Sequence, residues 1–304
     1  MKTVCIILAA GLGKRMKSSV PKVLHMVCGV PMVQSVINTA AKLKPWKVVI
    51  VAGEHMDLFK KSVGPEDILF ALQKEAKGTG HALRCALPVL EGFNGTLIVM
   101  NGDTPLIGPG TLRKFLALHG KNRNSISVLT FTTANPDDYG RIVRDDAGML
   151  LSIIEDKDAD PAQKKINEVN SGIYAINSDA LYLLDKLRKN RSKGEYYLTD
   201  IIALSSREGL NAAAYCIGIE EEFMGVNTRE ELHRASMLLK RQIIKGWIGK
   251  GVNFLDAGSV LIHPGVSIGR ETTIYPDVIL EGDTRIGRGA TIYPHVRIQN
   301  SRIG

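Results

Sequence analysis

The sequence has 304 residues, of which 44% are hydrophobic and 23% are charged, and its formal net charge is +8. These values are ordinary for a globular protein of about two domains, and they exclude intrinsically disordered, collagen-like and disulfide-scaffold chains. No apolar run reaches the ~18 residues of a membrane helix, and the N-terminus lacks the pattern of a signal peptide, so we expect a cytoplasmic protein with no membrane partner.

The basic residues are concentrated near the N-terminus. Residues 1–60 contain nine Lys or Arg against two acidic residues, so the rest of the chain sums to +1. A nucleic-acid-binding surface would usually be a basic stripe with interleaved aromatic residues. Instead, four basic residues surround one glycine-containing loop, namely Lys14, Arg15, Lys17 and Lys22. This grouping favours a small phosphorylated ligand and argues against a nucleic-acid partner.

Apolar, β-branched runs alternate with amphipathic segments along the first part of the chain. Residues 3–8 and 47–52 are continuous apolar runs, typical of strands buried on both faces. Helices are expected from near Pro31, where apolar residues recur at helical spacing, and over residues 110–119. Further strands are expected at residues 96–100, 125–132, 149–154 and 172–176. This alternation predicts an α/β, Rossmann-like fold with a mainly parallel sheet, whose ligands bind beyond the carboxyl ends of the strands.

The last part of the sequence has a different period. A helix is expected from about Thr228 to Trp247, with Thr228 and Glu231 forming a capping box at its start. Beyond it, large aliphatic residues recur at a strict spacing of six, at Ile262, Ile268, Ile274, Leu280, Ile286, Ile292 and Ile298. This period is typical of a hexapeptide β-helix. The series spans about two coils and stops without a polar cap, so we expect a truncated chain.

A glycine-containing loop follows the expected strand at residues 3–8. Gly11 and Gly13 allow backbone N–H groups to approach an anion closely. Arg15 can fork onto phosphate oxygens, and Lys22 could act as a second cation. The same residues also suit an exposed basic turn, and the loop by itself does not decide between the two.

Asp103 follows the expected strand at residues 96–100, within the run Asn101-Gly102-Asp103. A carboxylate at this position could hold Mg²⁺, which takes one or two protein oxygens together with ligand phosphates. The alternative is an ordinary turn aspartate, which an isolated Gly-Asp pair favours.

Several short motifs, taken in their order along the chain, resemble those of a known family. The openings Leu8-Ala-Ala-Gly-x-Gly-x-Arg-Met16 and Pro21-Lys-Val-Leu-His25 are similar to those of bacterial N-acetylglucosamine-1-phosphate uridylyltransferases, the N-terminal half of the bifunctional uridylyltransferase/glucosamine-1-phosphate acetyltransferases. Further matches follow in the family's order, at Gly78-Thr-Gly-His-Ala82, Gly102-Asp-Thr-Pro-Leu106, Tyr139-Gly-Arg-Ile142, Glu155-x-Lys-Asp158, Asn170-Ser-Gly-Ile173, Gly194-Glu-Tyr-Tyr-Leu-Thr-Asp200 and Gly225-Val-Asn227.

The resemblance covers the whole chain and implies three parts. Residues 1–227 would form a Rossmann-like nucleotidyltransferase domain with a mixed, mostly parallel sheet. Residues 228–249 would form a linker helix, and residues 250–304 a truncated, left-handed hexapeptide β-helix.

The resemblance also implies roles for individual residues. The residues that would hold the UTP nucleoside are Ala10, Gly11, Gln73, Gly78 and Thr79. Those that would grip the UTP phosphates as catalytic groups are Arg15 and Lys22. The residues that would bind the N-acetylglucosamine moiety are Gly140, Glu155, Asn170 and Thr199, with Tyr197 beside them. Asp103 and Asn227 would ligate Mg²⁺. The chain departs from the family at Asn101, where the family often has Tyr.

The reaction that the resemblance implies is Mg²⁺-dependent uridylyl transfer. The phosphate of N-acetylglucosamine 1-phosphate would attack the α-phosphorus of UTP, giving pyrophosphate and UDP-N-acetylglucosamine, a precursor for peptidoglycan and lipopolysaccharide synthesis. Because the nucleophile is already an anion, no general base is required, and catalysis rests on positioning and charge neutralisation. We expect no acetyltransferase activity, because the family's acetyltransferase site lies in later coils. The family forms homotrimers through its β-helix, and two coils leave that assembly open.

Two alternatives remain at this point. One is a nucleotidyltransferase with another substrate pair, such as dTTP and glucose 1-phosphate; the stretches that begin at Asn170 and Gly194 favour the N-acetyl sugar by resemblance. The other is an inactive paralogue that acts as a β-helix scaffold. Retention of the implied phosphate and metal residues argues against a scaffold.

Overall fold

The computed structural model describes residues 2–11, 13–63, 68–190 and 194–304. Contacts group the chain into two compact units. One is built from residues 1–24 and 33–225, and the other from residues 25–32 and 226–304. The three domain limits that the resemblance implies, 1–227, 228–249 and 250–304, stay predictions.

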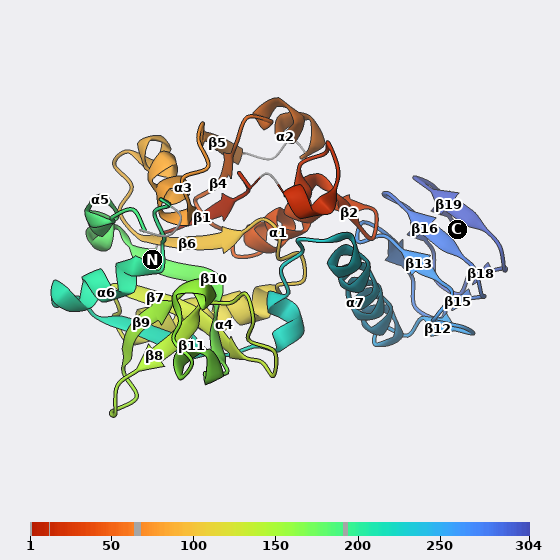
Figure 1. The fold of residues 1–304 in the computed structure, drawn as a ribbon. Helices are drawn as coiled ribbons and strands as arrows, with labels where there is room; N and C mark the ends of the chain where they lie inside the picture. The colour runs from red at the N-terminus through yellow and green to blue at the C-terminus, as the bar shows by residue number, and fades with distance from the viewer. Residues whose placement is uncertain (1, 12, 64–67, 191–193) are drawn as a thin grey trace. The chain divides into compact units, whose positions relative to one another are not determined.

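The first unit is built on one mixed sheet (Figure 1). Its strands are β1 (Thr3–Leu8), β4 (Lys47–Ala52), β5 (Ile68–Leu72), β6 (Thr96–Asn101), β7 (Ile126–Thr132), β8 (Arg141–Arg144), β9 (Leu150–Ile154), β10 (Glu168–Asn177) and β11 (Ala212–Cys216). The main path runs β11-β7-β10-β6-β1-β4-β5. Strands β6, β1, β4 and β5 are mutually parallel, β11 is parallel to β7, and β10 runs antiparallel to both β6 and β7. The β8–β9 hairpin extends from β10.

Helices cover both faces of this sheet, and each face has its own apolar core. The side chains of α1 (Met32–Ala41), α2 (Met56–Ser62) and α4 (Pro109–Lys121) pack in one core with alternate residues of the central strands. Those of α3 (Thr79–Ala86), α5 (Leu183–Lys186) and α6 (Asp200–Arg207) pack in the other. This two-sided burial explains the continuous apolar runs. Successive residues along β1 point to opposite faces of the sheet, and both faces are covered by apolar side chains. The expected Rossmann-like fold is confirmed.

Short 3-10 helices connect several of these elements. They are η1 (Lys14–Met16), η2 (Lys22–Leu24), η3 (Leu87–Leu90), η4 (Asp156–Asp158), η5 (Gln163–Lys165), η6 (Ser178–Ala180) and η7 (Glu220–Phe223). Glu222 in η7 accepts hydrogen bonds from the Gly108 N–H at 3.1 Å and from the Thr111 hydroxyl at 2.7 Å. A carboxylate at the start of α4 satisfies N–H groups that the helix leaves without partners, so this contact fixes the helix after β6.

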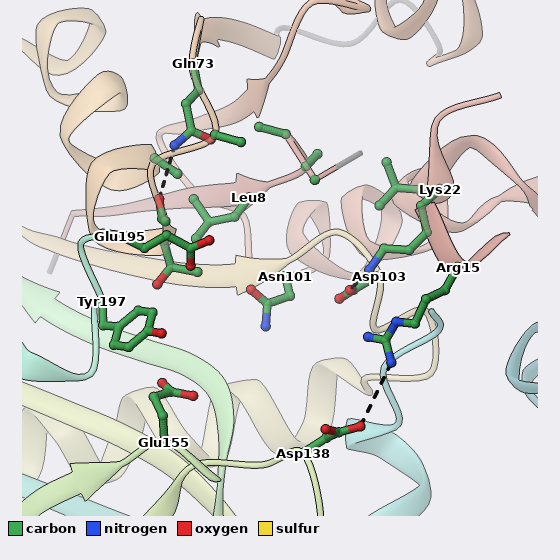
Figure 2. Close-up of a pocket in the computed structure, with 18 of the residues that line it drawn as sticks. Leu8, Arg15, Lys22, Gln73, Asn101, Asp103, Asp138, Glu155, Glu195 and Tyr197 are labelled. Atoms are coloured by element: carbon green, nitrogen blue, oxygen red, sulfur yellow. Dashed lines mark hydrogen bonds and ion pairs between the residues drawn. The ribbon is translucent and has the colours of Figure 1, made fainter. Parts of the chain in front are cut away.

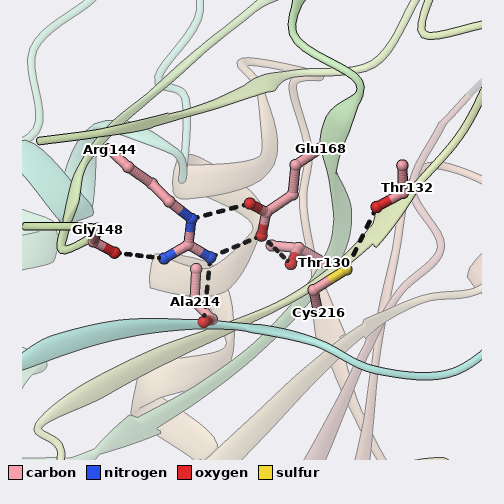
Figure 3. Close-up of polar contacts among 7 residues, drawn as sticks. All are labelled: Thr130, Thr132, Arg144, Gly148, Glu168, Ala214 and Cys216. Atoms are coloured by element: carbon pink, nitrogen blue, oxygen red, sulfur yellow. Dashed lines mark hydrogen bonds and ion pairs between the residues drawn. The ribbon is translucent and has the colours of Figure 1, made fainter. Parts of the chain in front are cut away.

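Arg144 connects the β8–β9 hairpin to the sheet (Figure 3). Its Nε and Nη2 atoms donate to the two carboxylate oxygens of Glu168 on β10 at 2.8 and 2.7 Å. Its remaining donors reach the carbonyl oxygens of Gly148 in the hairpin turn and Ala214 on β11. The Thr130 hydroxyl of β7 donates to the same carboxylate at 2.6 Å. One guanidinium–carboxylate pair therefore joins four strands at this edge of the sheet.

The second unit contains a small hairpin, a long helix and a coil of short strands. The hairpin pairs β2 (Met26–Val27) with β3 (Val30–Pro31), and the helix is α7 (Arg229–Ile248). The predicted capping box is present: the Thr228 side chain accepts the Glu231 N–H, and the Glu231 side chain accepts the Thr228 N–H. Gly29, in the hairpin turn at φ +78°, lies so close to the His263 ring that a Cβ there would overlap it.

The coil consists of three short parallel sheets with the strand orders β12-β15-β18, β13-β16-β19 and β14-β17-β20. Its strands are β12 (Asn253–Phe254), β13 (Leu261–Ile262), β14 (Ser267–Ile268), β15 (Thr273–Ile274), β16 (Ile279–Glu281), β17 (Arg285–Ile286), β18 (Thr291–Ile292), β19 (Arg297–Gln299) and β20 (Arg302–Ile303). The aliphatic residues spaced by six form its interior, where Ile274 and Leu280 are fully buried. The predicted hexapeptide β-helix is confirmed.

One sequence expectation differs from the structure. The strand expected at residues 172–176 begins at Glu168, because a bulge between Asn170 and Ile173 interrupts its pattern. Of the four cysteines, Cys5 and Cys28 are buried, Cys85 is partly exposed and Cys216 is exposed. Cys216 lies on β11, and a strand at the edge of a sheet is covered less than a central one.

Among the described residues, no helix is long and apolar enough to span a bilayer.

Candidate active site

A cavity of about 710 Å³ opens beyond the carboxyl ends of β1 and β6 (Figure 2). It is lined by Leu8, Ala9, Ala10, Gly11, Arg15, Lys22, Val23, Gln73, Ala76, Gly78, Thr79, Ala82, Asn101, Asp103, Asp138, Glu155, Asp156, Lys157, Glu195 and Tyr197. This is the place that parallel strand topology predicts for a ligand. All of these residues belong to the first unit.

Lys22 and Asp103 form a close ion pair in this cavity. The Lys22 ammonium lies 2.5 Å from the Asp103 carboxylate, and their side chains are 11% and 21% exposed. Lys22 is held by η2, and a side chain at Gly13, which has φ +61°, would overlap the Lys22 stem. Asp103 follows a turn in which the Gly102 N–H donates to the Leu8 carbonyl. The two strand ends therefore bring together charges that lie 81 residues apart in the sequence.

Arg15 faces Asp138 across the cavity (Figure 2). Their closest atoms are 3.9 Å apart, and the two side chains are 62% and 78% exposed. A pair this exposed contributes little to stability, so an incoming anion can compete for the guanidinium. Asp138 has a φ of +67°, in the left-handed region that few residues other than glycine adopt.

Gln73 and the Gly78-Thr79 turn form another part of the wall. The Gln73 amide donates to the Gly78 carbonyl at 3.1 Å and contacts His81 Nδ1 at 3.0 Å. Burial, together with the charges of nearby Lys77 and Arg84, lowers the pKa of His81. Its ring is therefore neutral at pH 7 and can accept this hydrogen bond.

Glycine is required at position 78 by both backbone angle and space. Gly78 has a φ of +95°, and a Cβ there would lie 2.6 Å from the Tyr196 carbonyl oxygen. The neighbouring Thr79 hydroxyl accepts the Leu198 N–H at 3.1 Å, and the Gly80 N–H donates to Tyr196. The start of α3 is thereby joined to the segment that carries Tyr197 into the cavity.

The residues predicted to bind the sugar fall into two groups. Glu155 and Tyr197 line the cavity, whereas Gly140, Asn170 and Thr199 are not among its lining residues. Thr199 is bonded to a lining residue, because its hydroxyl donates to Glu155 at 3.1 Å, and Asn170 and Gly140 are joined to each other by an N–H to carbonyl hydrogen bond of 2.8 Å. Their role in sugar binding stays a prediction.

Several cavity residues were not singled out from the sequence, among them Asp138, Asp156, Lys157 and Glu195. Arg141 also acts here without lining the cavity. Its side chain is fully buried, donates to Asp156 at 2.9 Å, and also bonds the Tyr139 carbonyl. A buried guanidinium needs such partners, so Arg141 fixes the turn that carries Glu155. Its place in the motif Tyr139-Gly-Arg-Ile142 was the signal that could have identified it.

The metal prediction rests on Asp103 within this cavity. Among the described residues, no group of three or more His, Cys, Asp or Glu side chains could hold a metal ion. A single carboxylate fits Mg²⁺, which is bound through one or two carboxylates and completes its shell with water and phosphates. The structure places a cationic group, the Lys22 ammonium, against this carboxylate. Asn227, the second predicted ligand, belongs to the other unit, and the metal pair stays a prediction.

Comparison with known families decides the class of this protein. The pattern of the nucleotidyl transferase family matches residues 4–245, a range that contains every cavity residue. The chain belongs to the nucleotidyl transferase family. The pattern of bacterial transferase hexapeptide repeats (six repeats) matches residues 265–300, within the coil of short strands. The expected nucleotidyltransferase class and hexapeptide repeat are thus confirmed.

Curated relatives resemble this nucleotidyl transferase over nearly its whole length. It is 43% identical over 300 residues to the bifunctional protein GlmU of Clostridioides difficile (strain 630), covering 98% of this chain and 65% of that protein. It is 42% identical over 304 residues to the bifunctional protein GlmU of Geotalea uraniireducens (strain Rf4), covering 98% of this chain and 66% of that protein. The expected family resemblance is confirmed, and the chain spans just under two thirds of these relatives' length.

Two solved structures share their fold with this chain. A UDP-glucose pyrophosphorylase complexed with UDP-glucose matches this nucleotidyl transferase with a TM-score of 0.65 at 19% identity, covering 80% of this chain and 100% of that chain. The apo form of a UDP-glucose pyrophosphorylase matches with a TM-score of 0.64. At this identity the likeness shows a shared fold alone.

Proposed function

We propose that this chain transfers a uridylyl group from UTP to N-acetylglucosamine 1-phosphate, giving UDP-N-acetylglucosamine and pyrophosphate. The observation that carries the proposal is one cavity whose lining contains two cations, Arg15 and Lys22, together with the uncharged residues Gly11, Gln73 and Gly78. A nucleoside triphosphate has the same division into a neutral base and a charged tail. The 43% identity to a bifunctional protein GlmU supports the choice of substrates.

The proposed mechanism needs no nucleophilic side chain. The sugar phosphate supplies its own anionic oxygen, which attacks the α-phosphorus of UTP as pyrophosphate leaves. Arg15 and Lys22 would bind the triphosphate and neutralise the charge that develops on the leaving group. Arg15 would leave its distant partner Asp138, and Lys22 would leave its close partner Asp103, so that both cations bind phosphate oxygens instead.

Asp103 would hold Mg²⁺ in this cavity. When bound, Mg²⁺ would orient the phosphates and stabilise their charge. Because Asp103 already pairs with Lys22, this ammonium would have to share the carboxylate with the metal ion or move to the phosphates when Mg²⁺ binds. Removal of divalent metal with a chelator is expected to stop turnover, and excess Mg²⁺ is expected to restore it.

The N-acetylglucosamine moiety would be bound by the five predicted sugar residues, namely Glu155, Tyr197, Gly140, Asn170 and Thr199. Glu155 is fixed for this role by the Thr199 hydroxyl at 3.1 Å. A carboxylate held in this way can accept hydrogen bonds from sugar hydroxyls with little loss of entropy.

The deciding experiment measures pyrophosphate release with UTP or dTTP crossed against N-acetylglucosamine 1-phosphate or glucose 1-phosphate, with and without Mg²⁺. Release chiefly with UTP and the N-acetyl sugar would support the proposal. Preference for another pair would keep the mechanism and change the substrates. Absence of release with all four pairs, from folded protein, would favour an inactive scaffold.

The proposal includes small-molecule partners in the cytoplasm and a homotrimer through the hexapeptide unit. Light scattering of the purified chain tests the assembly, since a trimer and a monomer differ threefold in mass.

A further inference from the structure

At a bulge in β10, both the oxygen and the nitrogen of the Asn170 side-chain amide make hydrogen bonds. The Asn170 Oδ1 atom accepts the Gly172 N–H at 2.9 Å, and the Nδ2 atom donates to the Tyr174 hydroxyl at 2.9 Å. A backbone N–H can only donate, so it must face the amide oxygen, and this assigns the two ends of the amide without ambiguity. The Tyr174 hydroxyl therefore receives the amide N–H.

Tyr174 lies at a position where an apolar residue would be the ordinary choice. Its side chain is 2% exposed and belongs to the core between β10 and the helices α3, α5 and α6, with Val99 and Val128 as its strand neighbours. Burial, reinforced by the negative charge of Glu155, raises the pKa of Tyr174, so its hydroxyl is neutral at every physiological pH. A hydroxyl taken out of water costs free energy unless it is hydrogen-bonded, so its presence here requires a reason.

The bulge forms part of the structure behind the cavity. A Cβ at Gly172, which has a φ of +77°, would overlap the side chain of cavity-lining Asn101. The Asn170 N–H donates to Gly140, and a Cβ at Gly140 would lie 3.6 Å from the Asn170 Cβ and 3.0 Å from Ile153. Two residues of the predicted sugar subsite thus act on the Tyr174 hydroxyl, Asn170 by a hydrogen bond and Glu155 by its charge.

We propose that Tyr174 is a positioning residue for the sugar-phosphate end of the cavity. By accepting one amide N–H, it orients Asn170 so that the second N–H and the second lone pair of the amide oxygen stay available for the substrate. An amide has two donors and two acceptor lone pairs, and the contacts with Gly172 and Tyr174 use one of each. The inference rests on the proposed function, because it takes Asn170 as a contact of the N-acetyl sugar.

The test is the variant Tyr174→Phe, which removes the hydroxyl and keeps the ring. The KM for N-acetylglucosamine 1-phosphate is expected to rise about tenfold, the effect of losing one hydrogen bond that orients a substrate contact. The KM for UTP is expected to stay within twofold, since the nucleoside wall is formed by other residues.

A double-mutant cycle separates positioning from general stability. In an Asn170→Ala background, Tyr174→Phe is expected to have no further effect on the KM for the sugar phosphate, because the group that Tyr174 orients is gone. The matched control is Tyr215→Phe, which removes a hydroxyl that contacts Asn122 and Asn124 away from the cavity. This control is expected to lower the melting temperature without changing either KM.

Three outcomes would overturn the inference. An unchanged KM for the sugar phosphate in Tyr174→Phe, with a lower melting temperature, would show a purely structural hydroxyl. Equal effects with and without Asn170 would show that Tyr174 acts elsewhere. If the wild-type chain turns over another sugar phosphate, the cycle is run with that substrate and tests Tyr174 independently of the proposed function. A wild-type chain inactive with all pairs would overturn both.

Discussion

At the residue scale, Asp103 is the group whose removal should matter most. Replacing it with Ala takes away the predicted metal ligand and leaves the Lys22 ammonium, 11% exposed, without its carboxylate partner. We expect Asp103→Ala to abolish pyrophosphate release at any Mg²⁺ concentration. The control is Lys77→Ala, since Lys77 pairs with Glu75 outside the cavity lining. Near-normal turnover of Asp103→Ala at low Mg²⁺ would contradict the assignment.

Arg15 should affect catalysis without affecting stability. Its guanidinium is 62% exposed and pairs with Asp138 at only 3.9 Å, so the folded state loses little when it is removed. Loss of a cation that stabilises developing phosphate charge typically costs two or more orders of magnitude. We therefore expect Arg15→Ala to lower kcat/KM for UTP by about 100-fold or more at an unchanged melting temperature. An effect below threefold would indicate an ordinary basic turn.

At the scale of elements, the pair of Arg144 and Glu168 joins strands that the cavity depends on (Figure 3). Burial alone would raise the pKa of Glu168, but hydrogen bonds from Arg144 and Thr130 outweigh it and lower the pKa below the usual 4.5. The pair therefore adds stability above pH 4.5, and this contribution is lost as the pH falls through the lowered folded-state value. Glu168→Gln is expected to destabilise the protein by about 2 kcal/mol at pH 7.

Chemical denaturation of the wild type and of Glu168→Gln at several pH values measures this contribution. The stability difference between the two proteins should be constant from pH 7 to pH 5 and should shrink below pH 4.5. A difference that does not depend on pH would mean that the carboxylate charge contributes nothing, and that the hydrogen-bonding shape alone matters.

At the scale of the whole molecule, His119 links stability to pH in the neutral range. It is 1% exposed on α4, and its two ring nitrogens contact Ser127 at 2.8 Å and Asn177 at 3.0 Å. Burial lowers its pKa below the usual 6.5. Below pH 6.5 the unfolded chain binds a proton that the folded chain does not, so stability falls with decreasing pH by up to about 1.4 kcal/mol per pH unit.

The variant His119→Gln isolates this effect, because it keeps polar atoms on the ring positions and removes the titration. Its free energy of unfolding should depend less steeply on pH between 6.5 and 5 than that of the wild type. Equal slopes for the two proteins would show that His119 has the same pKa in the folded and unfolded states and does not act as predicted.

Much of the fold could be predicted from local patterns. Strands β1 and β4 begin and end where their apolar runs do, and the capping box set the start of α7. Elements with a mixed pattern, such as α6 or the first half of β10, were missed. Helix α6 has only 8 residues, and the first half of β10 contains a single apolar side chain, Val169, so neither segment is long or apolar enough to show a sustained period.

The candidate site divides in the same way. The sequence by itself determined the glycine loop, the six-residue period and the residue types that suit phosphate and metal, because these depend on spacing along one segment. Only the tertiary structure decided that Lys22 pairs with Asp103, that the buried Arg141 pairs with Asp156, and that Tyr174 accepts a hydrogen bond from Asn170. These contacts depend on strand order and on a bulge, and strand order is set by the packing of the whole sheet, which no single segment specifies.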